Sequence, residues 1–102
     1  MSTLHTVNKS PFEKNALKSC LSHLSAGDAV LMIEDGVVGA RKGSSAAPMV
    51  QAALQTGKVY ALAPDLAARG IKPQDIVSGI ELVDYSGFAD LVANHGRTVA
   101  WL

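Results

Sequence analysis

Two short, continuous apolar runs constrain the fold of this 102-residue chain more than any other feature. They are AVLMIE at 29–34 and KVYAL at 58–62. Uninterrupted apolar runs of this length are typical of strands that are buried on both faces, and such strands belong to parallel sheets covered by helices. Helical patterns alternate with the strand patterns along the chain, and no tight hairpin signal joins the strands. The sequence therefore predicts an α/β fold with a mostly parallel sheet.

The remaining segments predict about five short strands flanked by helices. Further strands are expected at 3–7, 79–85 and 98–102, and helices at 10–25, 48–55, 63–70 and 86–95. Ser10, Pro11 and Glu13 form a strong helix start, with a capping serine, a proline at the first helical position and a capping-box partner. No internal repeat or linker divides the chain. Because its length suits one domain, residues 1–102 are expected to form a single one.

The charge balance argues against a nucleic-acid-binding protein. Nine basic and nine acidic side chains cancel at neutral pH, and no block of Lys and Arg appears. A protein that neutralises phosphates normally has a basic excess on one face. We therefore expect no direct contact with nucleic acid. The hydrophobic fraction of 48% and charged fraction of 18% fit a compact fold.

Compartment is inferred from cysteine use and from the distribution of apolar residues. A single cysteine rules out an intramolecular disulfide framework. The opening MSTLHTVNKS holds no apolar stretch of signal-peptide length, and no run is long enough to span a membrane. The expected setting is the reducing cytoplasm, without a membrane contact, where a lone thiol stays free.

Cys20 is the main candidate for chemistry, and the pattern around it leaves two interpretations open. At helical spacing it falls in an apolar stripe with Leu17 and Leu24, which is typical of a small buried core residue. His23 lies three residues later, and a protonated imidazole there could favour the thiolate. Cys20 is therefore either a core residue or a reactive thiol supported by His23.

Other candidate sites are weaker. The three histidines are scattered, so neither a metal site nor a metal cofactor is expected. The segment EDGVVGARKG matches no phosphate-loop motif, but it follows a buried strand, where α/β sheets often place ligand or partner contacts. This makes Asp35, Gly36 and Gly39 a predicted partner-contact loop. Trp101, near the C-terminus, is the best candidate for an interface anchor.

Five segments, in this order, resemble the DsrH/TusB family along nearly the full length. They are LHTVNKSPF (4–12), LMIEDGV (31–37), VYALAPDLAARG (59–70), VDYSGFADLV (83–92) and the ending VAWL. The resemblance implies a single-domain DsrEFH-like three-layer fold. It also implies a cytoplasmic heterohexamer with DsrE/TusD-type and DsrF/TusC-type paralogues, which passes persulfide sulfur to or from a DsrC/TusE-type carrier. No organic cofactor is implied.

The family resemblance leaves the pathway and the role of Cys20 to be decided. In both branches the main sulfur-carrying cysteine belongs to the DsrE/TusD-type subunit. DsrH-type chains carry a cysteine on the first helix that matches Cys20, so we expect a DsrEFH-type subunit in oxidative sulfur metabolism. The alternative is a TusB-type subunit that serves 2-thiouridine formation at the wobble position of transfer RNA.

Three hypotheses about the chain's role follow. Cys20 accepts persulfide sulfur as part of a sulfurtransferase complex, or it is inert and the chain is an assembly subunit. The third hypothesis comes from another class of protein. It is a free-standing domain that binds a small molecule in the strand-end cleft near Asp35.

Overall fold

The computed structural model describes residues 2–102. Its strands are β1 (Thr3–Val7), β2 (Ala29–Met32), β3 (Lys58–Leu62), β4 (Glu81–Val83) and β5 (Arg97–Trp101). Its α-helices are α1 (Ala16–Ser22), α2 (Ala47–Ala53), α3 (Ala63–Ala68) and α4 (Tyr85–Asn94), and its 3₁₀ helices are η1 (Glu34–Ala40) and η2 (Pro73–Asp75). None of the helices in residues 2–102 has the length and apolar character that crossing a membrane requires.

The five strands form one sheet in the order β4-β3-β2-β1-β5. Every neighbouring pair is parallel. All residues of the central strands β1 and β2 are buried, whereas β4 and β5, at the two edges, are largely exposed. The predicted α/β class and parallel sheet are confirmed, and β3 has the predicted bounds.

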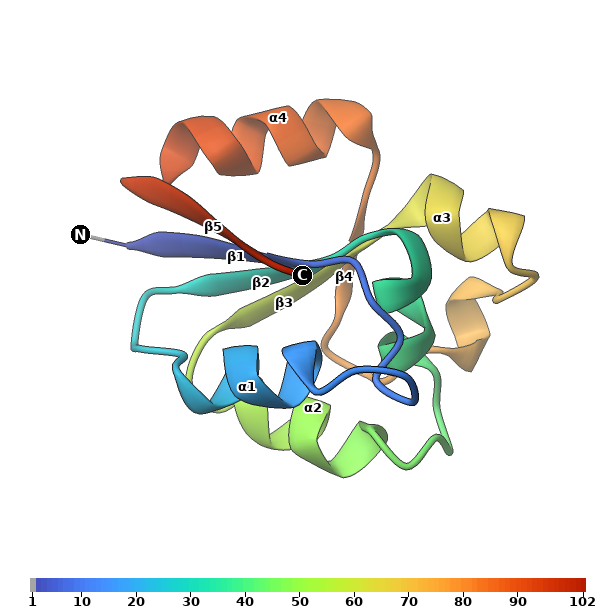
Figure 1. The fold of residues 1–102 in the computed structure, drawn as a ribbon. Coiled ribbons are helices and arrows are strands. Elements are labelled where there is room, and N and C mark those ends of the chain that lie inside the picture. Colours follow the sequence, from blue (N-terminus) through green and yellow to red (C-terminus); the bar gives the residue numbers. More distant parts are fainter. Residues whose placement is uncertain (1) are drawn as a thin grey trace.

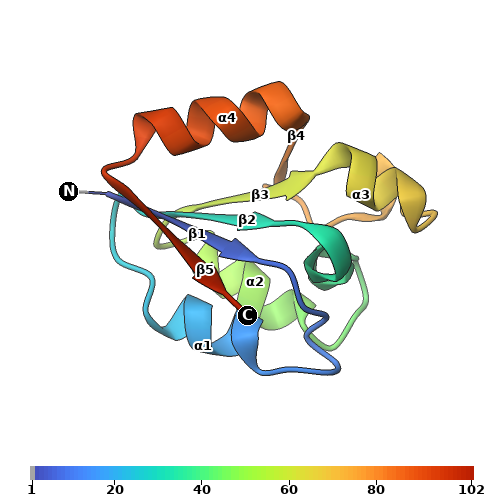
Figure 2. The ribbon, with the colours of Figure 1, turned by 45° about the horizontal axis from the view of Figure 1, so that its top comes forward.

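Helices cover the sheet on both faces and make three layers. Figures 1 and 2 show α1 and α2 on one face and α4 on the other. The helix α4 connects β4 to β5, which lie at opposite edges, so the chain crosses the whole sheet in this one step. This crossover brings the C-terminal strand beside β1.

Two hydrophobic clusters correspond to the two faces. The larger cluster joins α1 and α2 to the sheet and includes Leu17, Cys20, Val30 and Val50. The smaller one lies under α4 and consists of Leu4, Ala29, Leu31, Tyr60 and Leu91. Residues on successive strand positions alternate between the clusters, as the period of two requires.

The helix predicted for 10–25 is shorter and begins later than expected. Ser10 O accepts hydrogen bonds from the amides of Glu13 and Lys14, both at 3.1 Å, and this closes a single turn. Ser10 Oγ accepts from Phe12 N at 3.2 Å, a local turn contact that competes with helix formation. The helix then starts anew after Asn15. Phe12 is therefore 57% exposed and lies outside the apolar stripe.

The segment after β2 forms the 3₁₀ helix η1 where the sequence predicted only a turn. Two of its glycines allow close packing against neighbouring segments. A Cβ atom on Gly36 would lie 2.1 Å from the carbonyl oxygen of Val7, and one on Gly39 would lie 2.8 Å from Leu17 Cδ2. The strand β4 is also shorter than the predicted 79–85.

Candidate functional site

Cys20 is completely enclosed. It lies on the sheet-facing side of α1 with 0% exposure, so its predicted place in the apolar stripe is confirmed. Burial, and to a smaller extent the negative charge of Asp28, raise the pKa of its thiol from the ordinary value of 9.0 to about 12. A thiol of this kind is protonated at neutral pH, whereas the reactive form of cysteine is the thiolate. In this conformation Cys20 is a core residue.

His23 is directed toward Trp101 and its own helix. It is the C-cap residue of α1 and is exposed. Its Nδ1 lies 2.8 Å from the carbonyl oxygen of Ser19, which can only accept, so Nδ1 carries the proton and donates. Its ring centroid lies 5.5 Å from that of Trp101. These side-chain contacts of His23 are with Ser19 and Trp101, and its predicted support of the Cys20 thiol stays a prediction.

Trp101 belongs to a series of hydrogen bonds that joins the two ends of the chain. Its indole Nε1 donates to His5 Nδ1 at 3.0 Å. His5 Nε2, which must then carry the imidazole proton, donates to Asp28 Oδ2 at 3.1 Å. His5 is 5% and Asp28 7% exposed, so this chain of polar contacts lies inside the fold.

Asp28 accepts three hydrogen bonds. The amides of Thr3 and Ser25 donate to its carboxylate at 3.0 and 3.1 Å, in addition to His5. Burial alone would raise the pKa of Asp28, but the hydrogen bonds from His5, Thr3 and Ser25 outweigh it and hold the pKa below its ordinary value. The carboxylate therefore fixes the start of β1 and the segment between α1 and β2 in place.

These side chains line a hollow of about 310 Å³ at the β5 edge of the sheet, on the α1 face. His5 and Asp28 contribute to it from the interior, and His23, Arg97 and Trp101 from its rim. Arg97 Nε donates to Thr3 Oγ1 at 2.9 Å and closes one end. Trp101 is half-buried and has its N–H engaged within its own chain. Its role as an interface anchor stays a prediction.

The predicted partner-contact loop is divided between interior and surface. Gly36 and Gly39 are buried, whereas Asp35 is exposed and forms an ion pair with Arg69 at 2.8 Å. Glu34, with a left-handed φ of 49°, donates its amide to Asp65 Oδ2 at 2.6 Å. A partner that approached this loop would meet the charges of Asp35 and Arg69 first.

Within residues 2–102, no three side chains of His, Cys, Asp or Glu come together as metal ligands would. Asp28 is the centre of the polar network, and it is not among the site residues predicted from the sequence. A signal was present, because an acidic residue directly before a buried strand needs donors once it is buried. Its partners could not be read from spacing, since two of them, Thr3 and His5, lie on β1, more than twenty positions away in the sequence.

Known proteins resemble this chain over nearly its whole length. Residues 9–98 match the family described as DsrH like protein. Protein TusB from Escherichia coli K12 is 39% identical over 98 residues, which cover 96% of this chain and 99% of that protein. Protein TusB from Pectobacterium parmentieri is 34% identical with the same coverage.

Solved structures agree on the fold. The ychN protein from Escherichia coli superposes with a TM-score of 0.81, covering 98% of this chain and 99% of its own, at 15% identity. A likeness at this identity concerns the fold alone. The sequence matches go further, and by them the chain belongs to the DsrH/TusB family.

Proposed function

We propose that this chain is a TusB-type subunit of a sulfur-relay complex that serves 2-thiouridine formation in transfer RNA. The observation that carries the proposal is the 39% identity to a TusB protein over nearly the full length of both chains. These relatives favour the transfer RNA branch over the sulfur-oxidation branch that Cys20 had suggested. In the proposed complex, the partners are paralogues of the TusC and TusD kind.

We further propose that the subunit contributes to assembly and that its partner carries the persulfide. The support is the enclosure of Cys20, whose thiol is buried at 0% exposure and has a pKa of about 12. A sulfur-carrying cysteine must be reached by the donor and acceptor proteins. For Cys20, α1 would first have to separate from the sheet.

A DsrH-type relay subunit is the second candidate, and one observation favours it: a cysteine stands on the first helix. In that mechanism the Cys20 thiolate attacks the outer sulfur of a partner's persulfide. The new S–S bond forms on Cys20 as the partner's thiolate leaves, so no external oxidant is needed.

The pathway is tested by complementation. An Escherichia coli strain that lacks TusB should regain 2-thiouridine in its transfer RNA, measured by mass spectrometry of nucleosides, when it expresses this chain. Strains that express the chain at the same level without recovering 2-thiouridine would contradict the transfer RNA assignment.

The role of Cys20 is tested separately in a complex reconstituted with TusC- and TusD-type paralogues. The complex is loaded with persulfide sulfur, and each subunit's intact mass is measured without reductant. We expect this subunit to remain unmodified beside a loaded partner, and Cys20→Ala to leave the flux to the carrier unchanged. A gain of one sulfur atom that Cys20→Ala abolishes would instead establish a relay subunit.

A further inference from the structure

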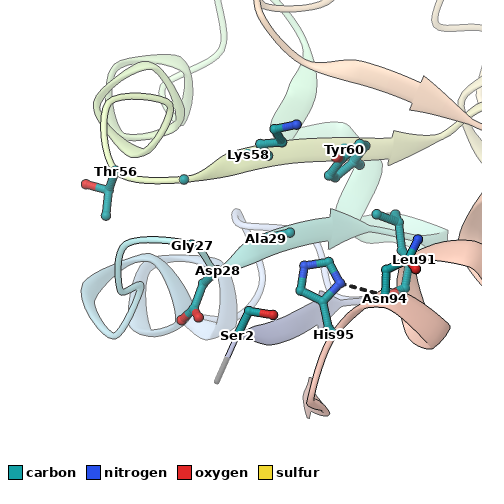
Figure 3. A pocket seen from close by; sticks show the side chains of 11 residues that line it. Ser2, Gly27, Asp28, Ala29, Thr56, Lys58, Tyr60, Leu91, Asn94 and His95 are labelled. Atoms are coloured by element: carbon teal, nitrogen blue, oxygen red, sulfur yellow. Dashed lines mark hydrogen bonds between the residues drawn. The ribbon is translucent and has the colours of Figure 1, made fainter.

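A spacious hollow lies at the amino ends of the strands. It measures about 510 Å³, and it is bounded by the starts of β2 and β3 and by the C-terminal end of α4 (Figure 3). This volume falls within the usual range of small-molecule sites, about 300–1,000 Å³. It lies at the end of the sheet opposite to the cleft near Asp35 that the sequence suggested.

Tyr60 is the first indication of a ligand. Its side chain is more than nine-tenths buried, with 8% exposure, and it lines the hollow. Within residues 2–102 its hydroxyl takes part in none of the side-chain hydrogen bonds, although a buried tyrosine hydroxyl usually has a partner. The sealed polar side-chain atoms without a partner are Asn8 Oδ1 and Ser44 Oγ. The Tyr60 hydroxyl is not sealed, so a molecule in the hollow can reach it.

Lys58 supplies a positive charge on the same side. It lies two positions before Tyr60 on β3, so both side chains belong to the α4 face of the sheet. Lys58 is exposed, and in the part of the chain described here it makes no ion pair within 4.0 Å. An ammonium group and a phenol hydroxyl both donate hydrogen bonds, and donors of this kind suit an acidic group.

The carboxylate of Asp28 does not cancel this charge directly. It borders the hollow, but it is occupied by the hydrogen bonds from Thr3, Ser25 and His5. Figure 3 shows it pointing away from Tyr60 and His95. The acidic side chain of the lining is therefore turned toward the protein's own donors.

His95 and Asn94 border the hollow from the end of α4. The Nδ1 of His95 donates to the carbonyl oxygen of Leu91 at 2.7 Å, which leaves Nε2 of the neutral ring as an acceptor. The ring faces the hollow in Figure 3. Beneath it lie the apolar surfaces of Ala29 and Leu91. A ligand that suits this lining carries a hydroxyl for His95 and a short carbon skeleton for the apolar floor.

We propose that this hollow binds a small organic anion, a carboxylate or phosphate ester that also bears a hydroxyl group. Its acidic group lies between Lys58 and Tyr60, and its hydroxyl donates to His95 Nε2. The inference does not depend on the sulfur-relay assignment, since it concerns residues on the α4 face and not Cys20.

The test is a titration of the full isotope-labelled chain, followed by amide NMR shifts. The probes are glycerol 3-phosphate, L-malate, inorganic phosphate and uncharged glycerol. We expect saturable shifts at Lys58, Tyr60, Asn94 and His95 with one or both organic anions, and none with glycerol. Equal affinity for inorganic phosphate would overturn the organic part of the proposal, and the absence of saturable shifts with both organic anions would overturn the whole.

Two variants and one control test whether these residues bind the ligand. Tyr60→Phe removes only a hydroxyl that has no partner in the described chain, so the fold should be unchanged while affinity falls about tenfold. Lys58→Gln should weaken binding by a similar factor. Lys18→Gln, an exposed lysine on α1, is the matched control and should bind like the parent chain. If Tyr60→Phe and Lys58→Gln both bound as tightly as the control, the site would lie elsewhere and the proposal would fail.

Discussion

A buried carboxylate is stable in a fold only when hydrogen bonds replace the water it has lost. Asp28 meets this condition with two backbone amides and the imidazole of His5. The same imidazole accepts from Trp101, so one carboxylate orients a histidine, and the histidine in turn holds the indole of the edge strand. Loss of the charge at Asp28 should therefore affect the stability of the whole chain.

Asp28→Asn should lower the free energy of unfolding by about 3 kcal/mol at pH 7. One of the hydrogen-bond donors to Asp28 would then face the NH₂ group of the asparagine, which cannot accept a hydrogen bond. The folded-state pKa of Asp28 is lowered, so its contribution is present above the unfolded pKa, about 3.9, and is lost as pH falls through the folded pKa. Denaturant unfolding between pH 2 and 7, followed by the fluorescence of the single tryptophan, measures both effects.

Asp90→Asn, at an exposed position on α4, is the control and should change stability by less than about 0.5 kcal/mol. If the free energy of unfolding depended on pH below 4 in the same way for the parent chain and for Asp28→Asn, the carboxylate would not act in this way.

Cys20 should react with thiol reagents only when the fold opens. With a pKa of about 12, roughly one thiol in ten thousand is ionised at pH 8, and the enclosed sulfur also excludes the reagent. We expect labelling at least about 100-fold slower than in denaturant, monitored by absorbance with an aromatic disulfide reagent. A Cys20→Ala/Ser45→Cys chain places the thiol at an exposed position and should label fast. If the native parent chain and the native Cys20→Ala/Ser45→Cys chain were labelled at equal rates, α1 would have to open readily.

Helical periodicity was enough to predict the burial of Cys20, but it gave no indication of the polar network around Asp28. The helical spacing placed Cys20 on the apolar face, because burial of a helix face follows from local sequence. The polar network depends on residues that lie up to 96 positions apart, His5 and Trp101. No local pattern records such a contact, so the network could be found only in the folded chain.

Among the elements, η1 depends most on a single residue type. Gly36 lies so close to the Val7 carbonyl that a methyl group would overlap it. Gly36→Ala should therefore destabilise the chain by about 3 kcal/mol or more, measured by denaturant unfolding, or prevent folding. Gly43→Ala is the control: its φ is 75° but open space surrounds it, so we expect a loss of about 1 kcal/mol. Similar losses for both variants would mean that η1 adjusts to a side chain at position 36.

Elements were predictable where one local signal acted alone. The run KVYAL gave β3 with its observed bounds, since an apolar run between Gly57 and the proline of α3 has no competing structure. The helix expected from Ser10 failed because Ser10 bonds within a turn first. The 3₁₀ helix η1 was not foreseen, because its glycines are determined by contacts with Val7 and Leu17, which are distant in sequence.

In the whole molecule, stability should decline from the centre of the sheet to its edges. The strands β1 and β2 are buried throughout, whereas β4 and β5 are exposed. Amide hydrogen exchange of the isolated chain should be slowest at Val30 and Leu31 and clearly faster at Leu82 and Val99. Uniform protection across the five strands would show that the sheet opens only by global unfolding.

The crossover by α4 also has a consequence for synthesis on the ribosome. Strand β1 leaves the ribosome early, whereas its neighbour β5 is made last. Trp101, the β5 residue that donates to His5, is made 96 residues after that histidine. At about 5–20 residues per second, the nascent chain keeps an unpaired edge on β1 for roughly 5–20 seconds. Until then the emerging chain carries a strand open to foreign pairing, and a chaperone would act best during this interval.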